Sequence, residues 1–231
     1  SLLLISDYSQ VELRVLAHIS QDEHLMAAFQ HGEDIHTATA MRVFGIEKAE
    51  DVTPNDRRNA KAVNFGVVYG ISDFGLANNL GISRKAAKDY IQTYFERFPG
   101  IKNYMETIVR EARDKGYVET IYHRRPPLPD INSRNAVVRG YAERNAINAP
   151  IQGSAADIIK VAMARIYQRF QTEGIQAKMI LQVNDELNFS VPGEEKERVE
   201  EIVIEEMEHA YRMHVPLKAD CGWGKNWLEA H

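Results

Sequence analysis

The chain has 231 residues, of which 44% are hydrophobic and 26% charged, and a formal net charge of −5 at pH 7. This composition is typical of a globular protein and excludes a disordered, collagenous or membrane-embedded one, because the longest apolar runs fall far below the about 20 residues of a membrane-spanning helix. The single cysteine, Cys221, excludes an internal disulfide framework and a cysteine zinc site, and it fits a reducing cytosol. No signal-peptide pattern opens the chain, so we find no reason to expect secretion.

The N-terminal residues predict a strand followed directly by a helix. The apolar run at residues 2–5 is typical of a buried strand, and Ser9 with Glu12 three positions later is a capping-box pattern. Asp7 therefore lies where the strand passes into the helix. An acidic side chain at such a junction is well placed to bind a divalent cation, and the alternative is that Asp7 only caps the helix.

Residues 22–116 predict helices throughout, interrupted by Gly32, Gly45, Gly81 and Pro99-Gly100. Thr53-Pro54 predicts a helix start, with Thr as N-cap, Pro in the first helical position and Asp56 in the first turn. The run Tyr117–Tyr122 predicts a short strand. Three prolines within residues 123–130 predict a loop, because proline fits neither a helix interior nor a central strand.

The last third of the chain alternates between helical and strand-like patterns. In order, the expected elements are a helix at 154–173, strands at 179–183 and 186–191, a helix at 194–213 and a strand at 215–220. The two middle strands are joined at Asn184-Asp185, which suits a tight hairpin. Strands at both ends of the chain with helices between them predict an α+β fold, in which a sheet subdomain carries a helical insertion.

One segment within the insertion combines positive charge with aromatic rings. Arg57, Lys61, Phe65 and Tyr69 recur every four residues, and each step advances only about 40° around a helix, so the four form one stripe. The stripe lies in the only basic part of the chain, since residues 51–150 hold 16 Lys and Arg against 11 Asp and Glu. Cations suit a triphosphate and rings suit a flat base or sugar, whereas the alternative is a solvated basic turn leading into core aromatics.

Two glycines flank the aromatic end of this stripe. Gly66 and Gly70 each cost a helix about 1 kcal/mol relative to alanine. We therefore expect the close approach of another body at these two positions.

A second pair of carboxylates lies at the predicted hairpin tip. Asp185 and Glu186 are flanked by apolar strands, so they form either a plain polar turn or a metal site. The metal site requires the sheet to bring Asp185 next to Asp7. Two carboxylates placed in this way are able to hold two magnesium ions for chemistry at a phosphate.

Other polar residues are less specific. Arg144, Asn148 and Gln152 share a four-residue spacing, which suits either a row reaching into a nucleic-acid minor groove or an ordinary surface stripe. His36 is a candidate phosphate contact or a neighbour of a helix N-cap.

Three of these segments together resemble the A, B and C motifs of the A-family DNA polymerases, the bacterial DNA polymerase I type. Residues 7–14 look like motif A, residues 57–70 like motif B and residues 183–186 like motif C. The resemblance runs the whole length of the chain, because Ile35-His36-Thr37, residues 149–157, Asn226-Trp227 and His231 also match the family. Three motifs in order and at suitable spacing argue against a chance resemblance.

The resemblance implies template-directed DNA synthesis. In that reaction a primer 3′-hydroxyl attacks the α-phosphate of an incoming deoxynucleoside triphosphate, and pyrophosphate leaves. Two Mg²⁺ ions would be held by Asp7 and Asp185, helped by the backbone carbonyl of Tyr8, with Glu186 beside them as a secondary catalytic carboxylate.

The resemblance also implies how nucleotide and DNA bind. Arg57 and Lys61 would grip the triphosphate, and Lys61 is the candidate proton donor to pyrophosphate. Glu12 would crowd the sugar 2′ position and so reject ribonucleotides. Gln10 and His36 would support the phosphates and their surroundings. Phe65 would pack on the sugar, and Tyr69 would stack near the template. Primer-template DNA would be bound by Arg144, Asn148, Gln152 and Asn184.

The chain departs from the family pattern in two ways. Asn184 stands where motif C normally has His, and Asn is shorter and uncharged, which affects positioning of the primer terminus rather than metal binding. Family members also carry a DNA-gripping thumb, further palm strands and usually nuclease domains before motif A. None of these is in the 231 residues, so we expect a piece of a longer protein.

These observations predict an antiparallel palm sheet built from residues 1–19 and 131–231, with a helical fingers insertion at residues 20–130. The expected partners are primer-template DNA, deoxynucleoside triphosphates and the missing thumb and upstream palm segments of the parent chain, in a bacterial cytoplasm near the nucleoid. We expect the chain alone to polymerise weakly or not at all. The rival hypotheses are a non-catalytic DNA- or nucleotide-binding module and a metal-dependent nuclease.

Overall fold

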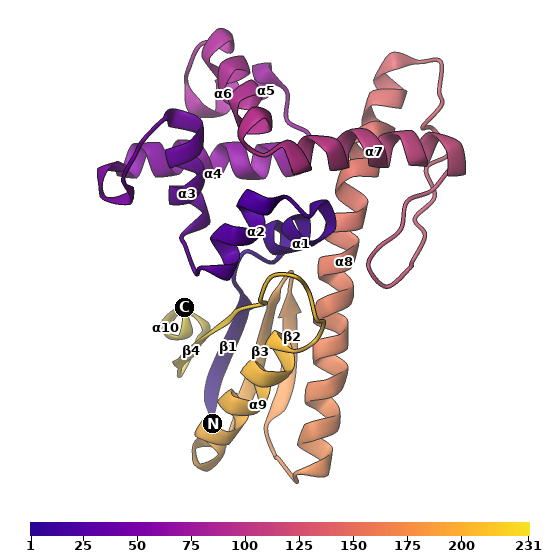
Figure 1. The fold of residues 1–231 in the computed structure, drawn as a ribbon. Helices are drawn as coiled ribbons and strands as arrows, with labels where there is room; N and C mark the ends of the chain where they lie inside the picture. The colour runs from indigo at the N-terminus through magenta and orange to yellow at the C-terminus, as the bar shows by residue number, and fades with distance from the viewer. The chain divides into compact units, whose positions relative to one another are not determined.

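The computed structural model describes all residues from 1 to 231 and contains one four-stranded antiparallel sheet. Its strands are β1 (Leu2–Tyr8), β2 (Lys178–Val183), β3 (Glu186–Val191) and β4 (Ala219–Gly224), in the order β2-β3-β1-β4 (Figure 1). The predicted hairpin is formed by β2 and β3. The α+β class and the antiparallel sheet are confirmed.

Helices make up most of the remaining chain. They are α1 (Val11–Ser20), α2 (Glu23–Gln30), α3 (Ile35–Phe44), α4 (Pro54–Val68), α5 (Asp73–Leu80), α6 (Arg84–Arg97), α7 (Pro99–Lys115), α8 (Ala136–Thr172), α9 (Lys196–Glu208) and α10 (Trp227–Ala230), with short 3₁₀ turns at Ala49–Asp51 and Gly193–Glu195. None of them combines the length and the apolar character that a membrane crossing requires.

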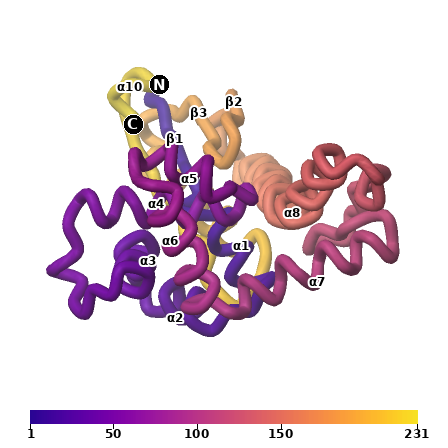
Figure 2. Tube along the Cα trace, turned by 90° about the horizontal axis from the view of Figure 1, so that it is seen from above, coloured from indigo at the N-terminus to yellow at the C-terminus, as the bar shows by residue number.

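The chain divides into two compact units. Residues 1–12 and 153–231 form the sheet unit, and residues 13–152 form the helical unit. The helical unit contains residues 20–130, the predicted insertion, and extends beyond them at both ends. The chain passes from the helical unit into the sheet unit within α8, which Figure 2 views nearly end-on.

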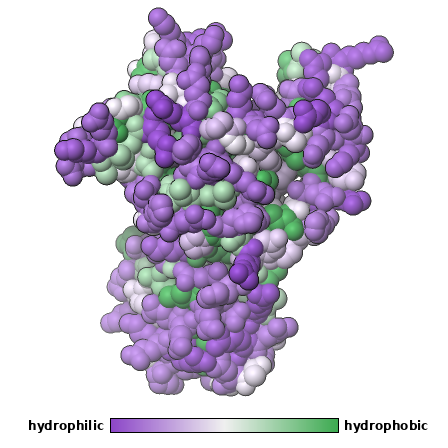
Figure 3. Space-filling view, viewed as in Figure 1, coloured by the Kyte–Doolittle hydropathy of each residue, from purple (hydrophilic) through white to green (hydrophobic).

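The sheet unit has two different faces. One face is apolar: Leu4, Leu187 and Phe189 are fully buried, and the ring of Phe170 on α8 meets that of Phe189 at 6.0 Å. Helix α9 packs on the same face, where Tyr8 Oη donates to the carbonyl of Met207 at 2.6 Å. The outer surface over α9 is largely hydrophilic (Figure 3), as its many exposed glutamates require. The opposite face carries Asp7 and α10.

The helical unit is built from capped helices around its own core. The cap predicted at Thr53 is confirmed: Thr53 and Asp56 form a reciprocal capping box, and Pro54 opens α4. A second cluster joins α7, the following loop and the first part of α8 (Figure 2), and it consists of Ala112, Val118, Leu128, Ile131, Ala142 and Ala146.

Four predicted elements are wrong in position, length or kind. Tyr117–Tyr122 forms no strand, and Tyr117 makes a single bridge to Pro127, because the prolines opposite supply no N–H donors. The last strand spans 219–224 instead of 215–220, since Pro216 cannot join a ladder.

The third difference concerns the predicted helix at 154–173. It is the second half of α8, which continues through Pro150 and Gly153. The buried residues on either side, Ile151 and Ile158, stabilise this stretch against the modest cost of the glycine. The helix predicted at 194–213 is also shorter, since α9 ends at Glu208.

Candidate functional site

The sheet register places three carboxylates in one row. Asp7 on β1 lies directly opposite Glu186 on β3 and directly opposite Asp220 on β4. Residues directly opposite each other in an antiparallel pair project from the same face, and like charges in such positions destabilise the sheet. This row therefore concentrates negative charge at the end of the sheet, on the face away from α9.

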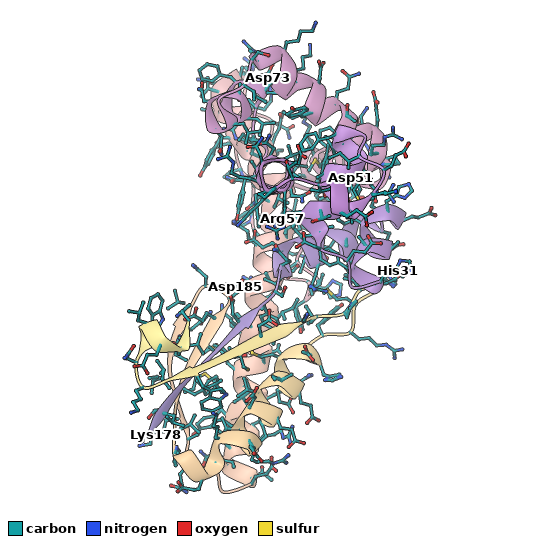
Figure 4. All side chains as sticks on the ribbon, turned by 90° about the vertical axis from the view of Figure 1, so that its left-hand side faces the viewer. His31, Asp51, Arg57, Asp73, Lys178 and Asp185 are labelled. Atoms are coloured by element: carbon teal, nitrogen blue, oxygen red, sulfur yellow. The ribbon has the colours of Figure 1, made fainter.

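The β2–β3 hairpin adds a fourth carboxylate. Asn184 takes a left-handed conformation with φ 54°, and the carbonyl of Asp185 accepts a hydrogen bond of 3.2 Å from the N–H of Tyr8. This bond ties the hairpin tip to the end of β1, where Figure 4 labels Asp185. The carboxylates of Asp185 and Asp7 are close enough to perturb each other, so the structure brings together the two carboxylates that the sequence pairs.

Both carboxyl groups of this pair bind protons more readily than an ordinary aspartate. Partial burial, followed by the negative charges of Asp185 and Glu186, raises the pKa of Asp7 to about 7. Burial also raises the pKa of Asp185. Because the two carboxyl groups interact, they titrate as one pair.

These properties fit a divalent cation. Two close carboxylates concentrate negative charge that a cation would neutralise, and Asp7 is exposed enough to be reached. No group of three or more His, Cys, Asp or Glu side chains is arranged to hold a metal. The pair would therefore leave most coordination positions to water and substrate oxygens, which is how Mg²⁺ is commonly bound.

Glu186 has different surroundings from the pair. It is buried, and its oxygens accept hydrogen bonds from Asn188 and His231 at 3.0 and 2.8 Å. His231 and Trp227, which lie at and beside α10, were not among the predicted site residues. Only their match to the family pattern singled them out in the sequence.

The helical unit carries a separate pocket of about 680 Å³ along α4. Three of the four stripe residues line it: Lys61 is exposed, Phe65 half-buried and Tyr69 exposed. Arg58 and Arg144 also line the pocket, so it contains one cation from α4 that the stripe pattern did not include. A pocket with three cations and two aromatic rings suits a phosphorylated, flat ligand.

Arg57 differs from the rest of the stripe. Figure 4 labels it on α4, and its guanidinium pairs with Asp34, with an Nη2–Oδ2 distance of 2.8 Å. Asp34 is the N-cap of α3 and accepts from the backbone N–H groups of His36 and Thr37. These contacts outweigh the partial burial of Asp34 and lower its pKa to about 2. A phosphate that binds Arg57 would therefore either share its guanidinium with the Asp34 carboxylate or displace that carboxylate.

The glycines beside the stripe have internal explanations. A side chain at Gly66 would collide with Ile71 of the same unit, and Gly70 has a left-handed φ of 69° beside the side chain of Arg144. The predicted close approach is therefore made by the chain itself. Neither glycine requires an external body.

His36 lies inside the helical unit rather than at its surface. It is 1% exposed, its Nδ1 accepts from Asn64 Nδ2 at 3.0 Å, and Asn64 Oδ1 accepts from Thr39 Oγ1 at 2.9 Å. Burial, with the positive charge of Arg57, lowers the pKa of His36 to about 4. His36 is therefore neutral at physiological pH, with its remaining proton on Nε2.

The predicted DNA contacts lie in both units. Arg144, Asn148 and Gln152 follow one another on the continuous helix α8, and Asn148 Nδ2 donates to the last-turn carbonyl of Val68 on α4 at 3.2 Å. Asn184 is exposed at the hairpin tip of the sheet unit. Gln10 and Glu12 are half-buried where β1 passes into α1.

Comparison with known proteins gives one consistent result. The family model described as DNA polymerase family A matches residues 1–229. The chain is 68% identical over 230 residues to DNA polymerase I of Lactococcus lactis subsp. lactis and 58% identical over 229 residues to DNA polymerase I of Bacillus caldotenax. The two matches include 100% and 99% of this chain but only 26% of each relative, so the chain spans about a quarter of their length.

A solved structure is also similar. It is described as the POL domain of Pol1 from M. smegmatis in complex with DNA primer-template and dNTP, and it matches with a TM-score of 0.96 and 45% sequence identity. The match covers 100% of this chain and 40% of that one.

Proposed function

Because this chain belongs to DNA polymerase family A, we propose that it carries metal-binding and nucleotide-binding parts of a template-directed DNA polymerase active site. The observation that supports this most directly is the convergence of Asp7 and Asp185, which the backbone bond from Tyr8 to Asp185 holds at the end of β1. Paired carboxylates also suit a nuclease, but a nuclease gives no reason for the pocket lined by Lys61, Phe65 and Tyr69.

Asp7 and Asp185, with the backbone carbonyl of Tyr8, would hold two Mg²⁺ ions. Bound Mg²⁺ would favour ionisation of the primer 3′-hydroxyl and stabilise negative charge on the transferred phosphate. The two side chains would stay within reach of each other through the Tyr8–Asp185 backbone bond, and Asp7, whose pKa is raised, would release its proton on binding the cation.

The helical unit would bind the deoxynucleoside triphosphate. Lys61 would contact the phosphates and donate a proton to the leaving pyrophosphate, and Arg57 would contact them with the guanidinium N–H groups that Asp34 does not engage. Phe65 and Tyr69 would pack on the sugar and near the templating base. Glu12 would exclude a 2′-hydroxyl, and Gln10 and His36 would support the phosphate contacts.

Primer-template DNA would be the second partner. Arg144, Asn148 and Gln152 would contact its minor groove, where acceptors common to all correct pairs allow a check of geometry. Asn184 would face the primer terminus. The rest of the parent polymerase would supply the contacts to DNA that lie outside these residues.

The test of this function uses a chimera in which the chain replaces the matching quarter of the Lactococcus lactis enzyme. We expect primer extension with Mg²⁺, and loss of at least about a thousandfold in rate for Asp7→Ala or Asp185→Ala. Asp89→Ala, which changes an exposed carboxylate of the helical unit, is the matched control. Extension that survives both active-site substitutions would disprove the proposal.

Nucleotide binding is tested on the chain itself. Binding of a fluorescent deoxynucleoside triphosphate should weaken roughly tenfold for Lys61→Ala, the loss expected for one charge-assisted contact. Lys85→Ala, an exposed lysine of α6 outside the pocket, should leave binding unchanged. Equal effects of the two substitutions would show that the affinity comes from general charge rather than from this pocket.

A further inference from the structure

The carboxylate of Glu186 is held in a fixed direction by three donors. Its Oε2 accepts from His231 Nε2 at 2.8 Å, and its Oε1 accepts from Asn188 Nδ2 at 3.0 Å and from Trp227 Nε1 at 3.4 Å. The Glu186 side chain is only 11% exposed, whereas Asp7 directly opposite it is exposed. Two of the three donors come from the α10 segment.

His231 is itself held at both ring nitrogens. Its Nδ1 faces the carbonyl of Trp227 at 3.2 Å while its Nε2 faces Glu186, and the imidazole packs on the Trp227 ring with 3.9 Å between centroids. Carbonyl and carboxylate oxygens only accept, so both bonds form fully when both nitrogens carry a proton. The pair is then an imidazolium with a carboxylate.

Helix α10 reaches this position because β4 has glycines beneath it. A side chain at Gly222 would collide with the carbonyl oxygen of Ala230, and one at Gly224 would collide with Glu229. Gly222 lies across from Ile5, two residues along β1 from Asp7. The helix therefore lies against the same face as the carboxylate row, directly beside it.

We propose that α10 and His231 form a clamp that withholds Glu186 from the cation site of Asp7 and Asp185. His231 and Trp227 are then positioning residues that act through Glu186. The inference rests on the proposed cation site. Its consequence is that Glu186 does not join Asp7 and Asp185 as a ligand, which leaves more coordination positions for substrate oxygens. Without the clamp, Glu186 would be free to turn towards the same cation from its place opposite Asp7.

Two neutral substitutions of one residue separate the clamp from simple loss of charge. In His231→Asn, the short amide can replace Nδ1 at the Trp227 carbonyl but cannot reach Glu186. In His231→Gln, the longer amide can still donate to Glu186. Both remove the imidazolium, so a difference between them reports the hydrogen bond to Glu186 alone.

The readout is binding of Mn²⁺ to the chain, measured by electron paramagnetic resonance of the free ion at one fixed pH. We expect His231→Asn to bind Mn²⁺ roughly tenfold more tightly than His231→Gln, since it gains a third carboxylate ligand. In a Glu186→Gln background the two variants should bind equally. Equal affinities without that background change, or weaker binding by His231→Asn, would overturn the clamp.

Two further variants keep the outcome interpretable. Asp7→Asn must abolish the measured Mn²⁺ binding; if it does not, the proposed cation site itself is wrong, whatever His231 does. Should His231→Asn fail to fold, Trp227→Phe removes the other α10 donor and should tighten Mn²⁺ binding too, whereas unchanged binding would count against the clamp.

Discussion

Protonation of His36 should make the chain sensitive to mild acid. His36 is buried with its Nδ1 accepting from Asn64, and its pKa is lowered to about 4, mainly by burial and then by Arg57. Above pH 6.5, the ring is neutral in both the folded and the unfolded chain. As the pH falls from 6.5 towards 4, the unfolded chain takes up a proton that the folded chain excludes, so stability falls by about 1.4 kcal/mol per pH unit, about 3 kcal/mol in total.

The assay is urea unfolding across this pH range for the chain and for His36→Gln. Other titrating groups are present in both proteins, so the difference between their free energies of unfolding isolates His36. Because Gln does not ionise, the difference in free energy of unfolding between the unsubstituted chain and His36→Gln should shrink or reverse as the pH falls. Parallel pH profiles would show that the buried ring is not held neutral, and the Asn64–His36 bond would then have to be reassigned.

Substitutions at three other positions test the packing and one ion pair. Tyr94→Phe should leave stability unchanged or raise it by up to about 1 kcal/mol in thermal unfolding, because the Tyr94 hydroxyl is buried with no hydrogen-bond partner; a clear loss would reveal one. Gly222→Ala should cost about 1–3 kcal/mol, since its methyl group meets the carbonyl of Ala230, and a neutral result would mean that α10 is not seated on β4. Asp34→Asn keeps an N-cap for α3 and weakens only the half-exposed pair with Arg57, so it should cost under about 1 kcal/mol, whereas Asp34→Ala should cost about 1 kcal/mol more; equal losses would contradict the capping role.

Local chemistry made part of the fold predictable. Thr53, Pro54 and Asp56 specify a helix start within four residues, and Asn184-Asp185 specifies a hairpin, because both signals depend only on neighbours in sequence. Distant packing explains one failed prediction: Gly153 ends no helix because its flanks are buried. The strand predicted at 215–220 failed for a local reason, because it includes Pro216, and the observed strand begins after it.

The site divides in the same way. Spacing alone places Lys61, Phe65 and Tyr69 along one pocket, since helix geometry fixes their relation. The partner of Arg57 is an N-cap on another helix, and the partner of Glu186 is a histidine 45 residues away. Such pairings follow from the tertiary fold, and no local pattern in the sequence signals them.

The account depends most on Asp7 and Asp185 acting together as a cation site. The direct measurement is Mn²⁺ affinity of the chain as a function of pH. Because the pKa of Asp7 is raised to about 7 and the cation must displace its proton, the apparent affinity should rise about tenfold per pH unit below this value and level off above it. An affinity that does not change across this range, or that Asp7→Asn leaves intact, would contradict the account.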